Sequence, residues 1–140
     1  MTSGILLEKL KEVKDYNELL QVAFWYIEKN GLNTMVLGPI FAHGPDHTAN
    51  NLDKLETTIS DLEGQGIQVF SQIPFLDINL AQETQMHHFE TEQKFHEFYF
   101  PLFRSGLITT AYFMPGWEAS RGSSWEHECC KENNIKIIYL

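Results

Sequence analysis

The sequence predicts one small α/β domain, residues 1–140, with helices on both faces of a mostly parallel sheet of four or five strands, forming three layers. Short apolar runs alternate along the chain with stretches in which apolar residues recur at helical spacing. One series has the order strand, helix, strand, which is a βαβ unit with a right-handed crossover. A hydrophobic share of 43% provides enough apolar mass for a core that needs neither disulfides nor a metal.

The first 31 residues (1–31) are expected to form a helical extension outside the core at 32–140. Apolar residues recur at helical spacing in both halves of this extension. Asp15-Tyr-Asn-Glu18 has the pattern of a capping box that restarts the helix, and Asn30-Gly31 ends it. The extension is therefore one broken helix or two short ones.

The βαβ unit begins with a buried strand at Thr34–Phe41, which a loop at Ala42–His47 follows. Apolar residues between positions 52 and 62 are then spaced three and four apart, which predicts an amphipathic helix closed by Gly64 and Gly66. Ile67–Phe70 is the second strand.

The second half of the chain continues the alternation of helices and strands. Pro101 is expected to kink or shorten one of the helices, because proline removes a backbone donor and clashes with the preceding turn. The expected elements are a short helix at Asn79–His88, a helix at Thr91–Arg104, a strand at Leu107–Phe113, a helix from Ser123 or Ser124 to about Asn134, and a last strand at Ile135–Leu140.

Composition excludes several classes of partner. The formal charge of -9 argues against a nucleic-acid polymer, which calls for a basic surface. No stretch approaches the roughly 20 apolar residues that span a membrane, so no membrane partner is expected. Cys129 and Cys130 are adjacent, which makes an ordinary disulfide between them geometrically poor and indicates a reducing compartment, the cytoplasm.

Two loops that follow strands are candidate ligand sites, at Gly38–Asp46 and between Phe113 and Ser124. Ligands of parallel sheets bind beyond the carboxyl ends of the strands. In the second loop, glycines allow the backbone to approach a ligand, and polar residues gather at a helix N-terminus, where N–H groups and the helix dipole favour an anion. These residues are Gly116, Ser120, Arg121, Gly122, Ser123 and Ser124.

Glu126 lies one turn inside the helix that follows, where its carboxylate can face whatever the loop holds. A carboxylate beside a sugar C1′ can act as a nucleophile or stabilise an oxocarbenium ion during glycosidic cleavage. Ser123-Ser-Trp-Glu126 is also the pattern of a capping box, in which Glu126 only bonds the helix start. Glu118 and Glu128 fit solvated surface acids as readily as catalytic ones.

The segment resembles the nucleoside 2-deoxyribosyltransferase-like superfamily, especially a branch of small domain-of-unknown-function proteins with a Pro-Gly-Trp-Glu-x-Ser-x-Gly-Ala signature followed by Glu. Leu37-Gly38-Pro39-Ile40 is similar to that superfamily's first-strand motif, and Asn50-Asn51 falls where its first helix begins. The likeness spans residues 35–140. The matching residues of the signature are Pro115, Gly116, Trp117, Glu118, Ser120, Gly122 and Glu126.

The resemblance implies a flavodoxin or Rossmann-like fold and an N-glycosidase or deoxyribosyltransferase. Glu126 would attack C1′ of a 2′-deoxynucleoside or its 5′-monophosphate and release the free base, with the seryl loop holding the phosphate. Asp77 or Glu118 would orient the substrate, no cofactor or metal is needed, and subunits would pair as a homodimer or higher homo-oligomer. The expected substrate-binding residues are Gly38, Pro39, Phe41, Trp117, Glu118, Ser120, Arg121, Gly122 and Ser123.

The sequence departs from the family at two positions. Ser105-Gly106 stands where the family has an aspartate before a strand, and Ser124 replaces a usual alanine. The missing acid favours an alternative function, a nucleotide-binding module without chemistry. A purely structural dimer is a third alternative, which would explain the aromatic helices but not the glycine and serine loop.

The other candidate groups have simpler interpretations. His43 and His47, with His87-His88 and the two cysteines, do not have the spacing of a zinc site, so no metal is expected. His43 and Asp46 would line the pocket mouth or be solvated, and His87, His88 and His96 would be surface groups. Trp117 and Phe41 could stack on a base or fill the core. The aromatic stripe at Phe95–Phe103 fits core or subunit interface.

Overall fold

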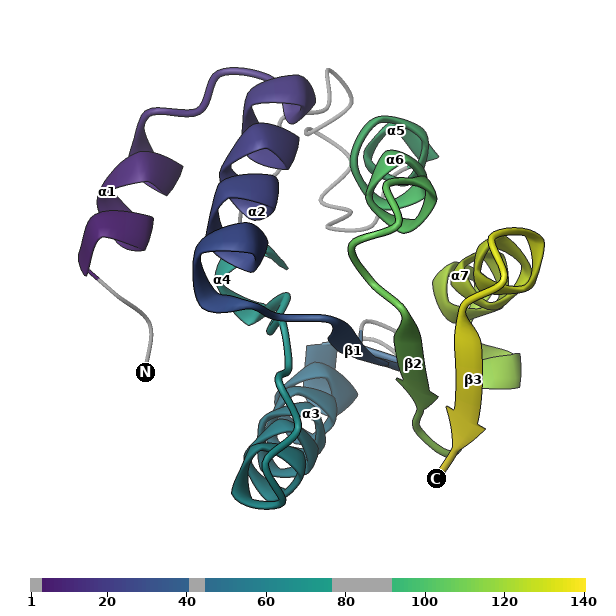
Figure 1. Ribbon diagram of the computed structural model, residues 1–140. Helices are drawn as coiled ribbons and strands as arrows, with labels where there is room; N and C mark the ends of the chain where they lie inside the picture. Colours follow the sequence, from purple (N-terminus) through teal and green to yellow (C-terminus); the bar gives the residue numbers. More distant parts are fainter. Residues whose placement is uncertain (1–3, 41–44, 77–91) are drawn as a thin grey trace.

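The computed structural model describes residues 4–40, 45–76 and 92–140 (Figure 1). The helices are α1 (Gly4–Lys11), α2 (Tyr16–Asn30), α3 (Pro45–Gly64), α4 (Ile73–Leu76), α5 (Glu92–Lys94), the π-helix η2 (Phe95–Tyr99), α6 (Phe100–Arg104), the 3₁₀ helix η3 (Trp117–Ala119) and α7 (Arg121–Glu132). The strands are β1 (Thr34–Leu37), β2 (Thr110–Phe113) and β3 (Lys136–Tyr139).

The sheet is parallel throughout, with the order β1-β2-β3. The expectation of four or five strands is wrong for the described part of the chain, because Ile67–Phe70 pairs with β1 only through a single parallel bridge, Thr34 to Val69. The reason lies just after Phe70. The Gln72 side chain donates from Nε2 to the Val36 carbonyl at 3.1 Å, thus occupying a β1 acceptor on this side, and the chain turns into α4 at Ile73.

Helices cover both faces of this sheet, as the sequence predicts. Figure 1 shows α3 on one face and α2, α6 and α7 on the other. Beneath α3, one apolar cluster joins Val36 of β1 to Leu55 and Ile59 of the helix. The larger cluster, on the opposite face, gathers the N-terminal helices, the aromatic residues of η2 and α6, and Ala111 and Phe113 of β2. The protein is thus an α/β fold with a three-stranded open sheet, which is compatible with a Rossmann-like arrangement.

The N-terminal extension consists of two helices, and the second begins at Asp15 and ends at Gly31 as predicted. Asp15 is the N-cap of α2, and its carboxylate accepts a hydrogen bond from the Glu18 N–H at 2.8 Å. The Glu18 carboxylate accepts from the Lys14 N–H at 2.7 Å, one residue before the position expected in a capping box. Gly31 ends α2 in the left-handed conformation, with φ of 63°.

The aromatic stripe is helical over its described length, and a π-helix accommodates Pro101. In an α-helix, the proline ring would clash with the carbonyl four residues earlier. The Phe100 N–H instead bonds to the Phe95 carbonyl, five residues back, and this wider turn precedes a fresh helix in which the proline occupies the first turn. The stripe belongs to the core: Phe95, Phe98 and Tyr99 are almost completely buried.

The helices and strands differ from the expected ones mainly in the residues at which they begin and end. The strands are shorter, at four residues each, whereas α3 begins at Pro45 and α7 at Arg121, before the expected starts. Helix α4 was not expected, and the helix expected at Asn79–His88 lies outside the described residues. Within the described ranges, no helix is both long and apolar enough to cross a membrane.

Candidate functional site

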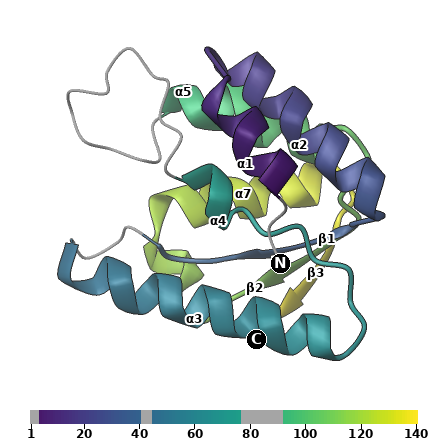
Figure 2. The same ribbon diagram turned by 90° about the vertical axis from the view of Figure 1, so that its left-hand side faces the viewer.

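The loops that follow β1 and β2 lie against each other at the carboxyl edge of the sheet. Leu37 and Phe113 are register partners at this edge, and the Met114 N–H bonds to the Leu37 carbonyl at 2.8 Å. A Cβ atom added at Gly116, which has φ of 89°, would lie 3.7 Å from the Pro39 ring. Figure 2 shows the first turns of α3 and α7 at this same edge. The two loops that the sequence singles out therefore meet, as far as they are described.

Gly38 is required for this close approach. A Cβ atom at Gly38 would lie 2.8 Å from the Met114 Cβ, and this contact cannot be relieved by a side-chain rotation. We expect Gly38→Ala to lower the free energy of unfolding by about 1–3 kcal/mol, as overpacking does in other cores. Gly64→Ala is the matched control, because nothing lies within 4 Å of its added Cβ. Equal denaturation midpoints for the two variants would contradict this role of Gly38.

The N-terminus of α7 is built by Ser120, which is the N-cap. Its hydroxyl accepts a hydrogen bond from the Ser123 N–H at 3.3 Å, and its carbonyl accepts from the Ser124 N–H at 2.9 Å. The helix therefore begins earlier than expected, and Ser123-Ser-Trp-Glu126 is not a capping box. Glu126 lies in the second turn of the helix. The N–H groups of Arg121 and Gly122, in the first turn, have no acceptor within the helix itself.

Ser123 and Glu126 lie three residues apart on the buried face of α7. Glu126 is only 2% exposed and Ser123 only 1%. The Ser123 hydroxyl has no hydrogen-bond partner among the described residues. A buried hydroxyl without a hydrogen-bond partner lowers the stability of the fold, unless a further group forms a hydrogen bond with it. A buried carboxylate one turn further along the same face makes this helix start a candidate ligand site, since buried titratable groups cluster at functional sites.

Three residues of the expected substrate set make contacts within the protein instead. The Arg121 guanidinium lies 4.5 Å above the Trp125 ring, and Arg121 Nη2 lies 3.9 Å from Glu92 Oε1. Trp117 stacks on His127 with ring centroids 4.1 Å apart, so one face of the indole is already covered. Glu118 is exposed, and its carbonyl accepts from the Ser124 hydroxyl at 3.4 Å.

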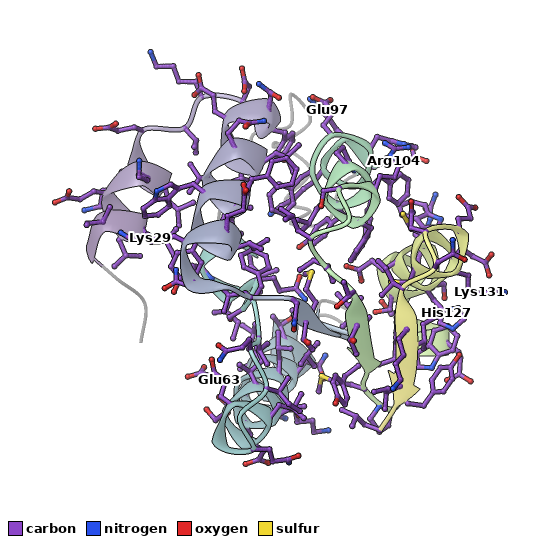
Figure 3. The ribbon with its side chains drawn as sticks, in the orientation of Figure 1. Lys29, Glu63, Glu97, Arg104, His127 and Lys131 are labelled. Atoms are coloured by element: carbon purple, nitrogen blue, oxygen red, sulfur yellow. The ribbon has the colours of Figure 1, made fainter. Side chains whose placement is uncertain are left out.

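His127 is the main site-adjacent residue that sequence analysis missed, although it directly follows Glu126. It is 8% exposed, and its Nε2 lies 2.7 Å from the Tyr139 hydroxyl. Figure 3 shows His127 beside β3. Burial lowers the pKa of His127 below 6.5 and Lys131 lowers it further, while Glu128 and Glu118 act in the opposite direction. The imidazole is therefore neutral at physiological pH.

Several expected residues cannot be placed, among them Asp46, whose side chain is not described. Phe41, Asp77, His43, His87 and His88 all lie outside the described residues. The expected contributions of Phe41 and Asp77 to the site thus stay predictions. His96, by contrast, is described and exposed, as expected for a surface group.

The two cysteines are free and buried. Burial raises the pKa of Cys130, and the Glu126 carboxylate, one turn earlier on the same helix, adds to this rise. Burial also raises the pKa of Cys129, against the opposing influence of Arg104. Both side chains are thus protonated thiols at neutral pH and have little nucleophilic character.

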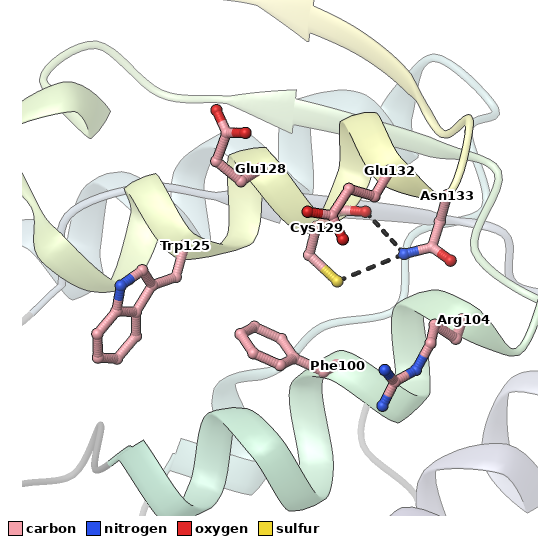
Figure 4. A pocket seen from close by; sticks show the side chains of 7 residues that line it. All are labelled: Phe100, Arg104, Trp125, Glu128, Cys129, Glu132 and Asn133. Carbon is pink, nitrogen blue, oxygen red and sulfur yellow. Dashed lines mark hydrogen bonds between the residues drawn. The ribbon is translucent and has the colours of Figure 1, made fainter.

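A groove of about 270 Å³ lies on another side of α7, between it and α6 (Figure 4). Cys129 contributes to it, and the Asn133 amide donates to the Cys129 carbonyl at 2.7 Å and approaches its Sγ at 3.5 Å. Among the described residues, none of those expected to bind the substrate or to act in catalysis lines this groove. Its lining consists of Phe100, Arg104, Trp125, Glu128, Cys129, Glu132 and Asn133.

Comparisons with known proteins add no assignment. Neither a family model, nor a curated protein, nor a solved structure matches this chain. We therefore infer the function from the site at the start of α7.

Proposed function

We propose that the protein cleaves the N-glycosidic bond of 2′-deoxynucleosides or their 5′-monophosphates, with Glu126 as the attacking group. The observation that carries this proposal is the presence, on the same buried face of α7, of the Glu126 carboxylate and of the Ser123 hydroxyl, which has no hydrogen-bond partner in the described part of the chain. The carboxyl edge of a parallel sheet is where ligands of such folds bind. The resemblance of Pro115–Glu126 to deoxyribosyltransferase-like proteins supports the same assignment.

The chemistry follows from the carboxylate. A Glu126 oxygen forms a bond to C1′ while the C1′–N bond breaks, and the electron pair leaves with the base, which takes a proton from an acid or from water. Water, or a second base in a transfer reaction, then attacks C1′ and frees the carboxylate. Both steps pass through an oxocarbenium-like transition state that a nearby negative charge stabilises.

The helix start supplies a means of binding the 5′ end. The first-turn N–H groups and the Ser123 hydroxyl are donors that a phosphate would satisfy, and the helix dipole favours its negative charge. Gly122 is buried in this turn. Since Arg121 faces Trp125, this binding would depend on backbone and hydroxyl donors more than on a cation.

A nucleotide-binding module without chemistry is the second candidate, and the small exposure of Glu126 favours it. A carboxylate that is 2% exposed has to be uncovered before it reaches a substrate. The absence of an acid at Ser105-Gly106 carries less weight for this candidate. These residues precede β2, so they lie toward the amino end of the sheet, away from the start of α7.

Chromatography for free base tests the proposal on a panel of deoxynucleosides and their 5′-monophosphates, with thermal unfolding measured on the same samples. We expect release of a base from at least one compound. Thermal stabilisation by a nucleotide without base release would support the binding module instead, since a ligand that binds the native state raises its apparent stability. Folded protein that shows neither effect would contradict both candidates.

A further inference from the structure

His127, in α7, contacts three other elements, η3, β2 and β3, at the carboxyl ends of the two strands. Its ring stacks on Trp117 of η3 at an interplanar angle of 18°, and it meets Phe113 of β2 edge-on at 5.1 Å. Its Nε2 is bonded to the hydroxyl of Tyr139, in β3. Tyr139 itself is 58% exposed, so this bond does not serve to satisfy a deeply buried phenol. The bond instead holds the imidazole in its orientation against the indole.

A continuous series of contacts leads from this cluster to the start of α7. The Trp117 carbonyl accepts a hydrogen bond from the Ser120 N–H at 3.1 Å. The Ser120 hydroxyl in turn accepts from the Ser123 N–H. These backbone and cap hydrogen bonds therefore connect the turn that carries Trp117 to the first turn of α7, as far as the Ser123 N–H.

We propose that His127 is a positioning residue: held by Tyr139, it fixes Trp117 and the η3 turn, and so sets the helix start that binds the 5′ end of the substrate. The substrate named in this inference rests on the proposed function, whereas the effect of His127 on the geometry of the η3 turn does not. His127 does not touch the substrate. Its effect is on binding through the phosphate, whereas the attack on C1′ belongs to Glu126.

The titration of His127 provides a spectroscopic signature of the contact. The charged and titratable groups around it are Glu118 on η3, Glu128 and Lys131 on α7, and Tyr139 on β3. Because the folded protein favours the neutral ring, the unfolded chain binds more protons near and below pH 6.5. The stabilisation from His127 is thus present above pH 6.5 and is lost as the pH falls toward the lowered pKa.

Hydrogen exchange of the full chain tests the positioning role without any ligand. The variants are His127→Phe, Tyr139→Phe and their double variant, with His96→Phe as the control, because His96 is exposed and its ring contacts only Phe100 among the described rings. We expect amides of residues 117–124 to exchange about three- to tenfold faster in the first three variants, the factor that the loss of one hydrogen bond gives. The double variant should be no faster than the single ones, because one contact is lost in each. Unchanged exchange, or additive effects of the single variants, would overturn the inference.

Tryptophan fluorescence and kinetics separate this inference from the proposed function. A protonated imidazole quenches an indole that it contacts, so the emission should fall below pH 6.5 in the parent and in the His96 control but not in His127→Phe. If base is released, His127→Phe should raise KM for a 5′-monophosphate about three- to tenfold, with kcat and the KM for the unphosphorylated nucleoside unchanged. Equal changes for both substrates would overturn the positioning role. If no base is released, the proposed function fails, and the exchange and fluorescence results still decide on the role of His127.

Discussion

Glu126→Gln is expected to reduce base release by about 10³-fold or more, with little change in KM, since loss of a nucleophile removes stabilisation of the transition state rather than of the bound substrate. Glutamine has nearly the same shape as glutamate but cannot form the bond to C1′. The carboxylate is 2% exposed, so the substitution also tests whether the buried acid is there for chemistry. Initial rates of base release from a deoxynucleoside 5′-monophosphate measure the effect.

Glu128→Gln is the matched control for this experiment. Glu128 lies on the same helix, but it is exposed and its Oε1 is 3.6 Å from Lys131 Nζ, a surface ion pair of small energetic value. We expect this variant to retain the parent rate. Far-UV circular dichroism of both variants checks that α7 is intact. A folded Glu126→Gln variant that releases base at the parent rate would remove Glu126 from the mechanism.

Gln72→Met is expected to lower the free energy of unfolding by about 2–4 kcal/mol, the largest change in stability that we predict. The Gln72 amide bonds to the Val36 carbonyl of β1 and accepts from the Tyr99 hydroxyl at 2.8 Å. Methionine has a similar length but offers neither bond. Two buried polar groups therefore each lose a hydrogen bond that water cannot replace.

Gln68→Met controls for the loss of an amide from the same segment. The Gln68 side chain is exposed, and its backbone carbonyl keeps the bonds it accepts from the Asn33 and Thr34 N–H groups. The free energy of unfolding of this variant, measured in urea, should lie within about 0.5 kcal/mol of that of the parent. If Gln72→Met changed the free energy of unfolding equally little, the hydrogen bonds by which Gln72 links Tyr99 of η2 to Val36 of β1 would have no part in holding the sheet edge.

Local signals in the sequence predict the elements better than their ends. The capping pattern at Asp15–Glu18 and Gly31 locates α2 almost to the residue, because it depends on neighbouring groups alone. The strand expected at Ile67–Phe70 is reduced to a bridge because Gln72, in the following turn, bonds to β1. This contact joins residues that are 36 positions apart, so no pattern within the segment reveals it.

The same limit applies to the site. Serine and glycine residues around the start of α7 predict a helix start that can hold an anion, and the structure brings this start to the carboxyl edge of the sheet as expected. The identity of the cap, Ser120, was missed because several serines compete for that position in the sequence. The contacts of His127 were also missed, since its partners come from η3 and β3, and a lone histidine beside an acid gives no signal of them.

Mass spectrometry of the protein during turnover tests the central claim, the attack of Glu126 on C1′, most directly. The parent is mixed with a deoxynucleoside 5′-monophosphate that it cleaves, quenched in acid and digested. The proposed mechanism predicts a peptide heavier by one deoxyribose 5′-phosphate, with the added group on Glu126, and no such peptide from Glu126→Gln. Base release from the parent with the added group on another residue, or with an equal yield of it from Glu126→Gln, would contradict the mechanism.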